Sequence, residues 1–170
     1  MLYLLDANIL ITAHNQYYPL DTVPEFWAWL RHVAVEGKLK IPLECYEEIK
    51  DGGTDESKDL LFAWINEAEN KAAVVLAEEV DPALVATVIE QGYANDLSDD
   101  EVEQLGRDPF LIAYALVAAA DRCVVTNEVS KPTRIRQNRH IPDVCNSLGI
   151  SWCNTFALTR VLGFKTSWKP

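Results

Sequence analysis

Short, mainly apolar runs alternate along this chain with longer segments in which apolar residues recur every three or four positions. Apolar runs of about four residues are typical of strands that are buried on both faces, as in a parallel sheet. Such runs occupy residues 2–5, 39–42, 73–76, 123–126 and 150–153. The pattern therefore predicts five parallel strands, the first of which ends at Asp6.

The segments between these runs carry the signals of amphipathic helices. Thr22–Glu25 and Ser98–Glu101 have the spacing of a capping box, in which a hydroxyl and a glutamate satisfy free amide groups of the first turn. Pro82 suits a first turn, and Gly37 suits a helix end. Predicted helices occupy residues 43–50, 55–69, 141–148 and 155–162, and others begin near residues 22, 81, 98 and 107. Because strands and helices alternate, we expect a three-layer α/β/α sandwich.

Length and composition fit one domain spanning residues 1–170. Hydrophobic residues make up 49% of the chain, as in globular proteins. No apolar run is long enough to span a bilayer, and no signal peptide is recognisable, so we expect a cytoplasmic protein without membrane contact. His140, Cys145 and Cys153 match no zinc-site spacing. We expect the cysteines to pack as small apolar groups.

Charge is unevenly distributed along the chain. The net charge of −11 argues, by itself, against nucleic-acid binding. From residue 129 onward, however, seven basic residues stand against a single acid. Four of them lie in one loop after the fourth predicted strand: Lys131, Arg134, Arg136 and Arg139. This basic loop is suited to a phosphate backbone, although a solvated loop or a dock for an acidic partner would have the same composition.

Acidic residues stand at predicted strand ends and helix starts. Asp6 ends the first strand, and Glu128 follows the fourth. Glu48 lies on the helix after the second strand, and Asp108 begins the most apolar helix. Ligands of open parallel sheets bind beyond the carboxyl ends of the strands, so we expect these four acids near one site. Asp6 and Asp108 are equally suited to cap the helices that follow them.

Carboxylates gathered at one site repel each other, by about 4 kcal/mol for a close pair at an intermediate dielectric constant. A divalent cation removes this repulsion, and Mg²⁺ prefers hard oxygen ligands. Such an ion lowers the pKa of water and holds the attacking and leaving oxygens of a phosphodiester. The acidic set therefore predicts a metal-dependent nuclease.

In their order and with their neighbours, these motifs resemble those of the PIN domain. The matching stretches are Leu4-Leu-Asp6-Ala-Asn8-Ile-Leu, Glu48-Ile49, Asp108-Pro-Phe-Leu-Ile-Ala-Tyr-Ala and Val124-Val-Thr126-Asn127-Glu128. The resemblance extends to VapC-type toxins and to an allied bacterial branch with an Ile-Pro-Asp-Val-Cys-like segment, here at residues 141–145. It implies a five-stranded parallel α/β/α sandwich and an endoribonuclease that uses Mg²⁺ or Mn²⁺. It also implies a toxin–antitoxin pair, an antitoxin encoded nearby and a homodimer.

The resemblance assigns metal binding and catalysis to Asp6, Glu48, Asp108 and Glu128. It assigns the orientation of waters, or of these acids, to Asn8, Thr126 and Asn127.

The second and fourth acids leave alternatives open. Glu44, Glu47 and Glu48 share one helical face, and their spacing does not select among them; the branched residue after Glu48 favours that one by resemblance. Glu128 stands where the family commonly has Asp, and Asp143 could compensate for it.

The leading hypothesis is metal-dependent hydrolysis of RNA, with the RNA backbone held by the basic loop. Two alternatives are a PIN-like RNA- or protein-binding module with weak or no turnover, and a related metal-dependent DNase. Two features motivate the first alternative. Glu128 stands where the family commonly has Asp, and residues 1–128 carry an excess of acidic residues. Trp27 and Trp29 stand two positions apart on one helix, so we expect one of them to lie in an interface.

Overall fold

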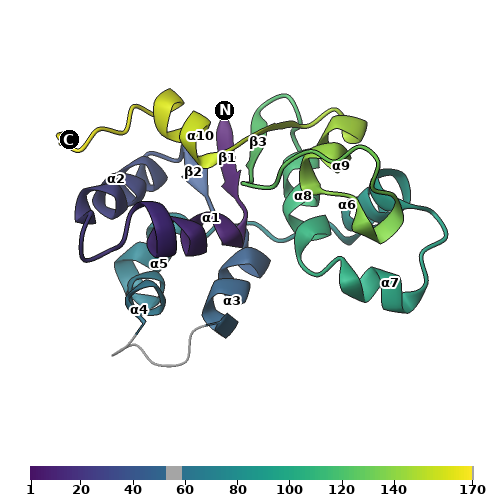
Figure 1. The fold of residues 1–170 in the computed structure, drawn as a ribbon, viewed down its shortest axis with the longest axis horizontal. Coiled ribbons are helices and arrows are strands. Elements are labelled where there is room, and N and C mark those ends of the chain that lie inside the picture. The colour runs from purple at the N-terminus through teal and green to yellow at the C-terminus, as the bar shows by residue number, and fades with distance from the viewer. Residues whose placement is uncertain (53–58, 170) are drawn as a thin grey trace.

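The computed structural model, which describes residues 1–52 and 59–169, has an α/β fold around a parallel sheet (Figure 1). Among these residues the sheet has four strands, in the order β2–β1–β3–β4, and all neighbouring strands are parallel. The strands are β1 (Leu2–Leu5), β2 (Leu39–Lys40), β3 (Arg122–Val125) and β4 (Ser151–Cys153). The central position of β1 explains its unbroken apolar run, because Leu4 and Leu5 are fully buried.

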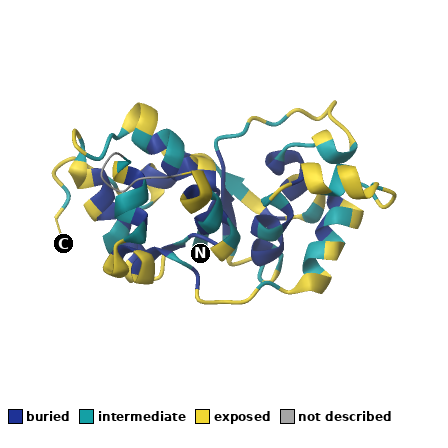
Figure 2. Cartoon of the chain, turned by 90° about the horizontal axis from the view of Figure 1, so that it is seen from below, coloured by how far each residue is buried: buried dark blue, intermediate teal, exposed yellow. Residues whose placement is uncertain are grey.

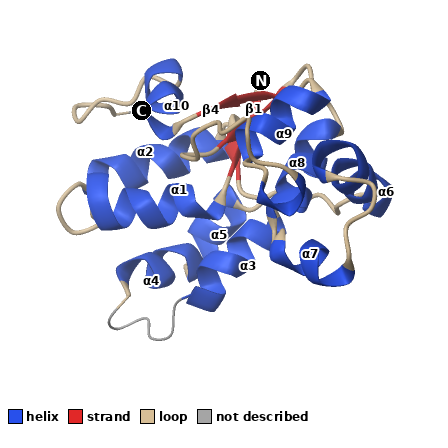
Figure 3. Cartoon of the chain, turned by 45° about the vertical axis from the view of Figure 1, so that its right-hand side comes forward, coloured by secondary structure: helices blue, strands red, loops and turns tan. Residues whose placement is uncertain are grey.

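Helices flank the sheet on both sides (Figure 3). The first group comprises α1 (Ala7–Thr12), α2 (Pro24–Val35), α3 (Leu43–Gly52), α4 (Leu60–Asn66) and α5 (Ala68–Val74). The second comprises α6 (Pro82–Thr87), α7 (Asp99–Gln104), α8 (Asp108–Leu116) and α9 (Ile141–Leu148), and α10 (Thr155–Val161) follows β4. Two π-helical turns, η1 (Ala13–Tyr17) and η2 (Val88–Tyr93), continue α1 and α6, and a 3₁₀ turn, η3 (Arg136–Asn138), lies in the basic loop. In the described part of the chain, no helix is both long and apolar enough to cross a membrane.

The predicted strand at residues 73–76 is wrong, and with it the prediction of five strands. Helix α5 continues to Val74, and Val75 joins the sheet through a single parallel bridge to Ile41, beyond β2. Within that bridge, the amide of Leu76 donates to the carbonyl of Ile41 over 2.8 Å. A buried helix end and a buried strand require the same short apolar run, so the sequence pattern did not distinguish them.

The helix predicted over residues 55–69 is divided in the structure. Residues 55–58 lie outside the described residues, and Asp59 caps α4 by accepting from the Phe62 amide over 3.0 Å. Glu67 then has an extended backbone (ψ 128°) and separates α4 from α5. The sequence Asp51-Gly-Gly also predicts a break after the helix at residues 43–50. Helix α3 instead continues to Gly52, and Gly53 lies outside the described residues.

The two predicted capping boxes differ in outcome. Ser98–Glu101 forms the reciprocal pair at the start of α7, as predicted. Thr22–Glu25 does not, because α2 begins after Val23 and the Thr22 hydroxyl donates to Asp21 instead.

Trp27 and Trp29 are both buried, each 2% exposed, so the prediction that one of them lies in an interface is wrong. Trp27 packs edge-on against Trp64 of α4, with ring centroids 5.0 Å apart. On the other flank of α2, Trp29 packs against Phe164, with centroids 5.1 Å apart. The chain end after α10 therefore supplies a second apolar cover for α2. In Figure 2, the buried residues lie mainly on the inner parts of the helices and on the central strands.

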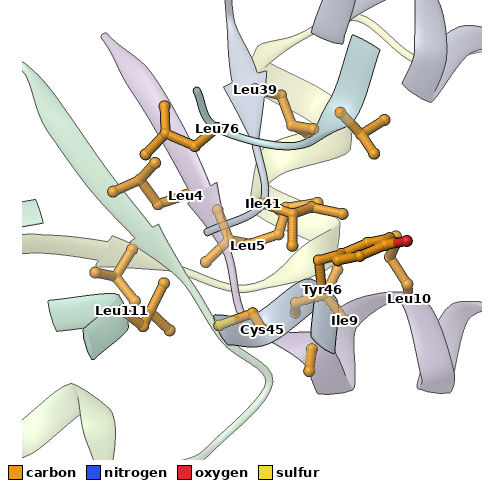
Figure 4. Packing of buried hydrophobic residues seen from close by; sticks show 14 of the residues in the cluster. Leu4, Leu5, Ile9, Leu10, Leu39, Ile41, Cys45, Tyr46, Leu76 and Leu111 are labelled. Atoms are coloured by element: carbon orange, nitrogen blue, oxygen red, sulfur yellow. The ribbon is translucent and has the colours of Figure 1, made fainter. Parts of the chain in front are cut away.

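Apolar packing beneath the carboxyl end of β1 joins three helices to the sheet (Figure 4). Leu5 of β1, Ile9 of α1, Cys45 of α3 and Leu111 of α8 are all buried there, with at most 2% exposure. Asp6 directly precedes α1, Glu48 lies on α3, and Asp108 is the first residue of α8. The packing of these helices therefore sets the relative positions of the three acids.

Replacing Trp29 with Ala is expected to lower the free energy of unfolding by about 3–5 kcal/mol, because the change leaves a cavity between α2 and the chain end. Urea denaturation followed by far-UV circular dichroism would measure this loss. The matched control is Val35→Ala on the same helix, where the side chain is 68% exposed and the expected change is within about 0.5 kcal/mol. Dissociation of an oligomer with unchanged unfolding energy would contradict the burial of Trp29.

Candidate functional site

Asp6 is fixed at the carboxyl end of β1 by two donors. One carboxylate oxygen accepts from the Asn8 amide over 3.3 Å and thereby caps α1. The other accepts from the Thr126 hydroxyl over 3.1 Å. Asp6 is 4% exposed, so these bonds hold its carboxylate in one orientation. The predicted capping by Asp6 is confirmed, and it leaves the residue at the edge of the sheet where ligands bind.

Thr126 connects the end of β3 to Asp6. Its side chain is fully buried, and its hydroxyl also accepts from the Glu128 amide over 3.2 Å. Asn127 instead faces α10, where its Oδ1 accepts from the amide and the hydroxyl of Thr155 over 3.2 and 2.9 Å. The Nδ2 atom of Asn127 is buried and has no partner among the described residues. Thr126 therefore orients an acid, whereas Asn127 ties two elements together.

Asn8 contributes to this arrangement through its backbone. Its amide is the donor to Asp6, while its side chain is exposed.

Asp108 is the first residue of α8 and does not cap it. The N-cap residue is Arg107, which makes no side-chain cap hydrogen bond, so the capping role considered for Asp108 is wrong. Burial, followed by the charges of Asp6, Glu128 and Glu48, raises the pKa of Asp108 to about 8. No donor in the described part of the chain lowers that pKa by hydrogen bonding to the Asp108 carboxylate.

The structure separates the three glutamates of α3. Glu48 is half-buried, which raises its pKa, and its charge acts on both Asp6 and Asp108. Glu47 pairs with Arg107 over 3.5 Å. Glu44 lies toward Tyr114, whose pKa it raises after the larger effect of burial. Glu48 is thus the member of this set that the fold brings to the other acids.

The Glu128 carboxylate is bonded to the start of α9 and also lies near the other acids. Its Oε2 accepts from the amide of Ile141 over 2.8 Å, at the start of α9, and lies 3.8 Å from Nδ1 of His140. Its charge nevertheless acts on Asp6 and Asp108. The longer side chain of Glu therefore reaches a helix start while remaining beside the cluster.

Asp143 holds the basic loop. Its two carboxylate oxygens accept from the Ser130 hydroxyl over 2.6 Å and from the Lys131 amide over 2.8 Å. Its charge is not among those that raise the pKa of Asp6 or of Asp108, so Asp143 does not take the place of Glu128 beside these acids.

The four acids form an acidic cluster, defined here as Asp6, Glu48, Asp108 and Glu128. Burial raises the pKa of Asp6 to about 6, against the opposing effect of its two hydrogen bonds, and the charges of Glu48 and Glu128 add to the rise. Hard carboxylate oxygens in excess of positive charge are the donor set that Mg²⁺ and Mn²⁺ prefer. Within residues 1–52 and 59–169, however, no three His, Cys, Asp or Glu side chains are arranged to hold an ion. The fit to a cation is therefore one of charge and donor type.

The basic loop is fastened to the protein by two of its four predicted RNA-binding residues. Arg136 donates through Nε and Nη2 to the two carboxylate oxygens of Glu101, over 3.0 and 2.8 Å, and through Nη1 to Asp96. Arg139 donates to the carbonyl of Gly92 and, over 2.7 Å, to the hydroxyl of Ser147.

Lys131 and Arg134 are exposed. Their side chains are accordingly the accessible cations of the loop.

Two residues beside the acidic cluster were not predicted from the sequence. Arg107 precedes Asp108, and its charge lowers the pKa of Glu48 against the larger effect of burial. Tyr93 ends η2, and its buried hydroxyl has no partner among the described residues. The adjacency of Arg107 to Asp108 was a usable signal, but Tyr93 falls in a segment that reads as a loop.

An α/β protein with carboxylates gathered at the carboxyl edge of a parallel sheet is the class that the fold and the site define. The family described as "Domain of unknown function (DUF4411)" matches residues 3–166, and the chain belongs to this family. The match includes the whole acidic cluster and the basic loop. A comparison with curated proteins found no match.

Replacing Asp108 with Asn is expected to stabilise the metal-free protein at alkaline pH. The pKa of Asp108 is about 8 in the folded state and about 3.9 in an unfolded chain. The folded state therefore binds more protons than the unfolded state between these values, and stability falls as pH rises through this window. In EDTA at pH 8.5, we expect the variant to exceed the wild type by on the order of 1–2 kcal/mol in unfolding free energy.

The same measurement at pH 5 should give a smaller difference, because Asp108 is then protonated in the folded wild type. Glu47→Gln is the control for removing a charge near the cluster, and it should show no such dependence on pH. Equal stability of the wild type and Asp108→Asn at pH 8.5 would contradict the raised pKa of Asp108.

Proposed function

We propose that this protein is a divalent-metal-dependent endoribonuclease that hydrolyses RNA phosphodiesters. The observation that carries the proposal is the gathering of the acidic cluster, whose members come from four different segments. Burial, followed by the charges of Asp6, Glu128 and Glu48, raises the pKa of Asp108 to about 8. Repulsion of this kind destabilises a fold unless a cation balances it, which supports a metal site at this edge of the sheet.

In this proposal the acidic cluster holds Mg²⁺ or Mn²⁺. The cation, when bound, lowers the pKa of water and balances charge on the phosphodiester. Asp6 is already oriented for ligation by the Asn8 amide and the Thr126 hydroxyl. Glu128 keeps one carboxylate oxygen for the site while the other accepts from the Ile141 amide.

The fold supports a PIN-like α/β/α arrangement as the finer description. Helices lie on both sides of the parallel sheet (Figure 1), and the Ile41–Val75 bridge adds a single parallel residue pair next to β2. The wider role as the toxin of a toxin–antitoxin pair, with an antitoxin partner and a homodimer, rests on the sequence resemblance alone.

The contact with the RNA backbone is proposed for Lys131 and Arg134. Both are exposed in the loop that begins directly after Glu128, and phosphate contacts by such cations supply sequence-independent affinity. Arg136 and Arg139 are assigned to holding the loop in place.

A binding module without turnover is the second candidate. It is favoured by the bond between Glu128 and the amide of Ile141, which draws one carboxylate oxygen away from the cluster. Mn²⁺-dependent cleavage of RNA separates the two candidates, and a DNA substrate of the same sequence separates a ribonuclease from a DNase.

We expect the purified protein to cleave single-stranded RNA in Mn²⁺ or Mg²⁺, and Asp6→Asn and Asp108→Asn to reduce the rate by at least about 100-fold. Loss of an outer partner of a metal ligand costs about 10–100-fold, so loss of a ligand should cost more. Cleavage of end-labelled oligonucleotides, with an EDTA arm, measures the rate.

The glutamates of α3 provide matched controls in the same assay. Glu48→Gln should reduce cleavage, whereas Glu44→Gln and Glu47→Gln should leave it within a few-fold of the wild type. Equal activity in all variants would identify a contaminant and remove the site assignment. Cleavage of DNA at the same rate would replace the ribonuclease proposal with the DNase.

Replacing both Lys131 and Arg134 with Ala is expected to weaken RNA binding at every sequence tested. Each lost phosphate contact should reduce the slope of log affinity against log salt by roughly 0.7–0.9. Fluorescence anisotropy over a range of KCl concentrations, with Asp6→Asn as the parent to prevent cleavage, measures this slope. Arg136→Ala should instead lower thermal stability, because its bonds to Glu101 are lost; an unchanged slope in the double variant would place the RNA elsewhere.

A further inference from the structure

Tyr93 is the last residue of η2, which packs against α8, the helix that begins at Asp108. The residue is 6% exposed, and its hydroxyl oxygen has no hydrogen-bond partner in the described part of the chain. After burial itself, the charges that raise the pKa of Tyr93 most are those of Asp108 and then Glu128. The hydroxyl therefore keeps its proton and remains a donor near two carboxylates.

The backbone next to Tyr93 packs closely against α9. Gly92 lies so close to this helix that an added Cβ would come within 2.6 Å of Val144 Cγ1. Arg139 donates to the Gly92 carbonyl from one nitrogen of its guanidinium, while another donates to the Asp143 carbonyl over 2.9 Å. Tyr93 is also the last residue of the π-helical turn η2, a rare geometry that is frequent at functional sites.

The Asp108 carboxylate lacks a hydrogen-bond donor, and the Tyr93 hydroxyl can provide one. Asp6, the other deeply placed aspartate of the cluster, accepts hydrogen bonds from the Asn8 amide and the Thr126 hydroxyl. No such bond to a described residue orients Asp108. Carboxylates that ligate metals are commonly held by an outer donor, which fixes their orientation, and a buried donor without a partner is costly to the fold.

We propose that Tyr93 is a positioning residue that donates a hydrogen bond to the Asp108 carboxylate when the acidic cluster binds a divalent cation. The inference rests on the proposed function and adds a donor for the second aspartate, equivalent to Thr126 for the first. One carboxylate oxygen of Asp108 then accepts from the phenol and the other faces the cation. Arg139 acts indirectly, by holding the Gly92 carbonyl and hence the ring of Tyr93.

The test is the affinity of the purified full chain for Mn²⁺, measured by isothermal titration calorimetry without RNA. We expect Tyr93→Phe to weaken Mn²⁺ binding by about 10–100-fold without lowering the thermal unfolding midpoint in EDTA, because the lost hydroxyl has no partner there. Tyr114→Phe is the matched control: its hydroxyl is satisfied by the Glu78 carbonyl over 3.2 Å, so that variant should lose stability and keep its Mn²⁺ affinity.

The outcomes separate the inference from the proposed function. Mn²⁺ binding by the wild type that is lost in Asp108→Asn but unchanged in Tyr93→Phe overturns the role of Tyr93 alone. Absence of Mn²⁺ binding by the wild type overturns the metal site and the role of Tyr93 together. In a Glu128→Gln background, Tyr93→Phe should still weaken binding; if it no longer does, the phenol acts on Glu128 and the assignment to Asp108 is wrong.

Discussion

Burial of several carboxylates together at the carboxyl end of β1 is the constraint on which the arrangement of the site depends. Asp6 is held there by the same bonds that cap α1 and connect β3, so it cannot turn away without loss of local structure. Apolar packing around Leu5 and Cys45 sets α3 beside β1 (Figure 4). The hydrophobic core thus forces together charges that would separate in an unfolded chain.

Much of the fold could be predicted because local sequence signals, such as apolar runs and capping boxes, coincide with the strands and helix starts of the structure. The run that ends at Asp6 forms the central strand, and Ser98–Glu101 starts α7 as a capping box. Failures occurred where distant segments decide the outcome. Ala73 and Val74 end a helix, and Val75 forms only a single bridge instead of a strand. Trp29 is buried by Phe164 from the chain end, which no helical periodicity encodes.

The acids of the candidate site could be predicted from strand ends and resemblance, but their partners could not. Three glutamates on α3 fit the same pattern, and tertiary packing brings Glu48 to Asp108 while Arg107 engages Glu47. Arg136 was predicted to bind RNA because it lies in a basic loop. Its guanidinium is instead bound by Glu101, a residue 35 positions away in sequence, which composition cannot reveal.

The two sides of the site are held by different means. On the β1 side, Asp6 depends on donors from the adjacent helix and strand. On the α9 side, Glu128 bonds to the Ile141 amide, and Tyr93 is carried by the contact of Gly92 with Val144. Long-range packing therefore controls one half of the acidic cluster. The basic loop joins β3 to α9 and is bonded to Asp143 and Ser147 of that helix. It is therefore part of the site's support as well as a candidate surface for RNA.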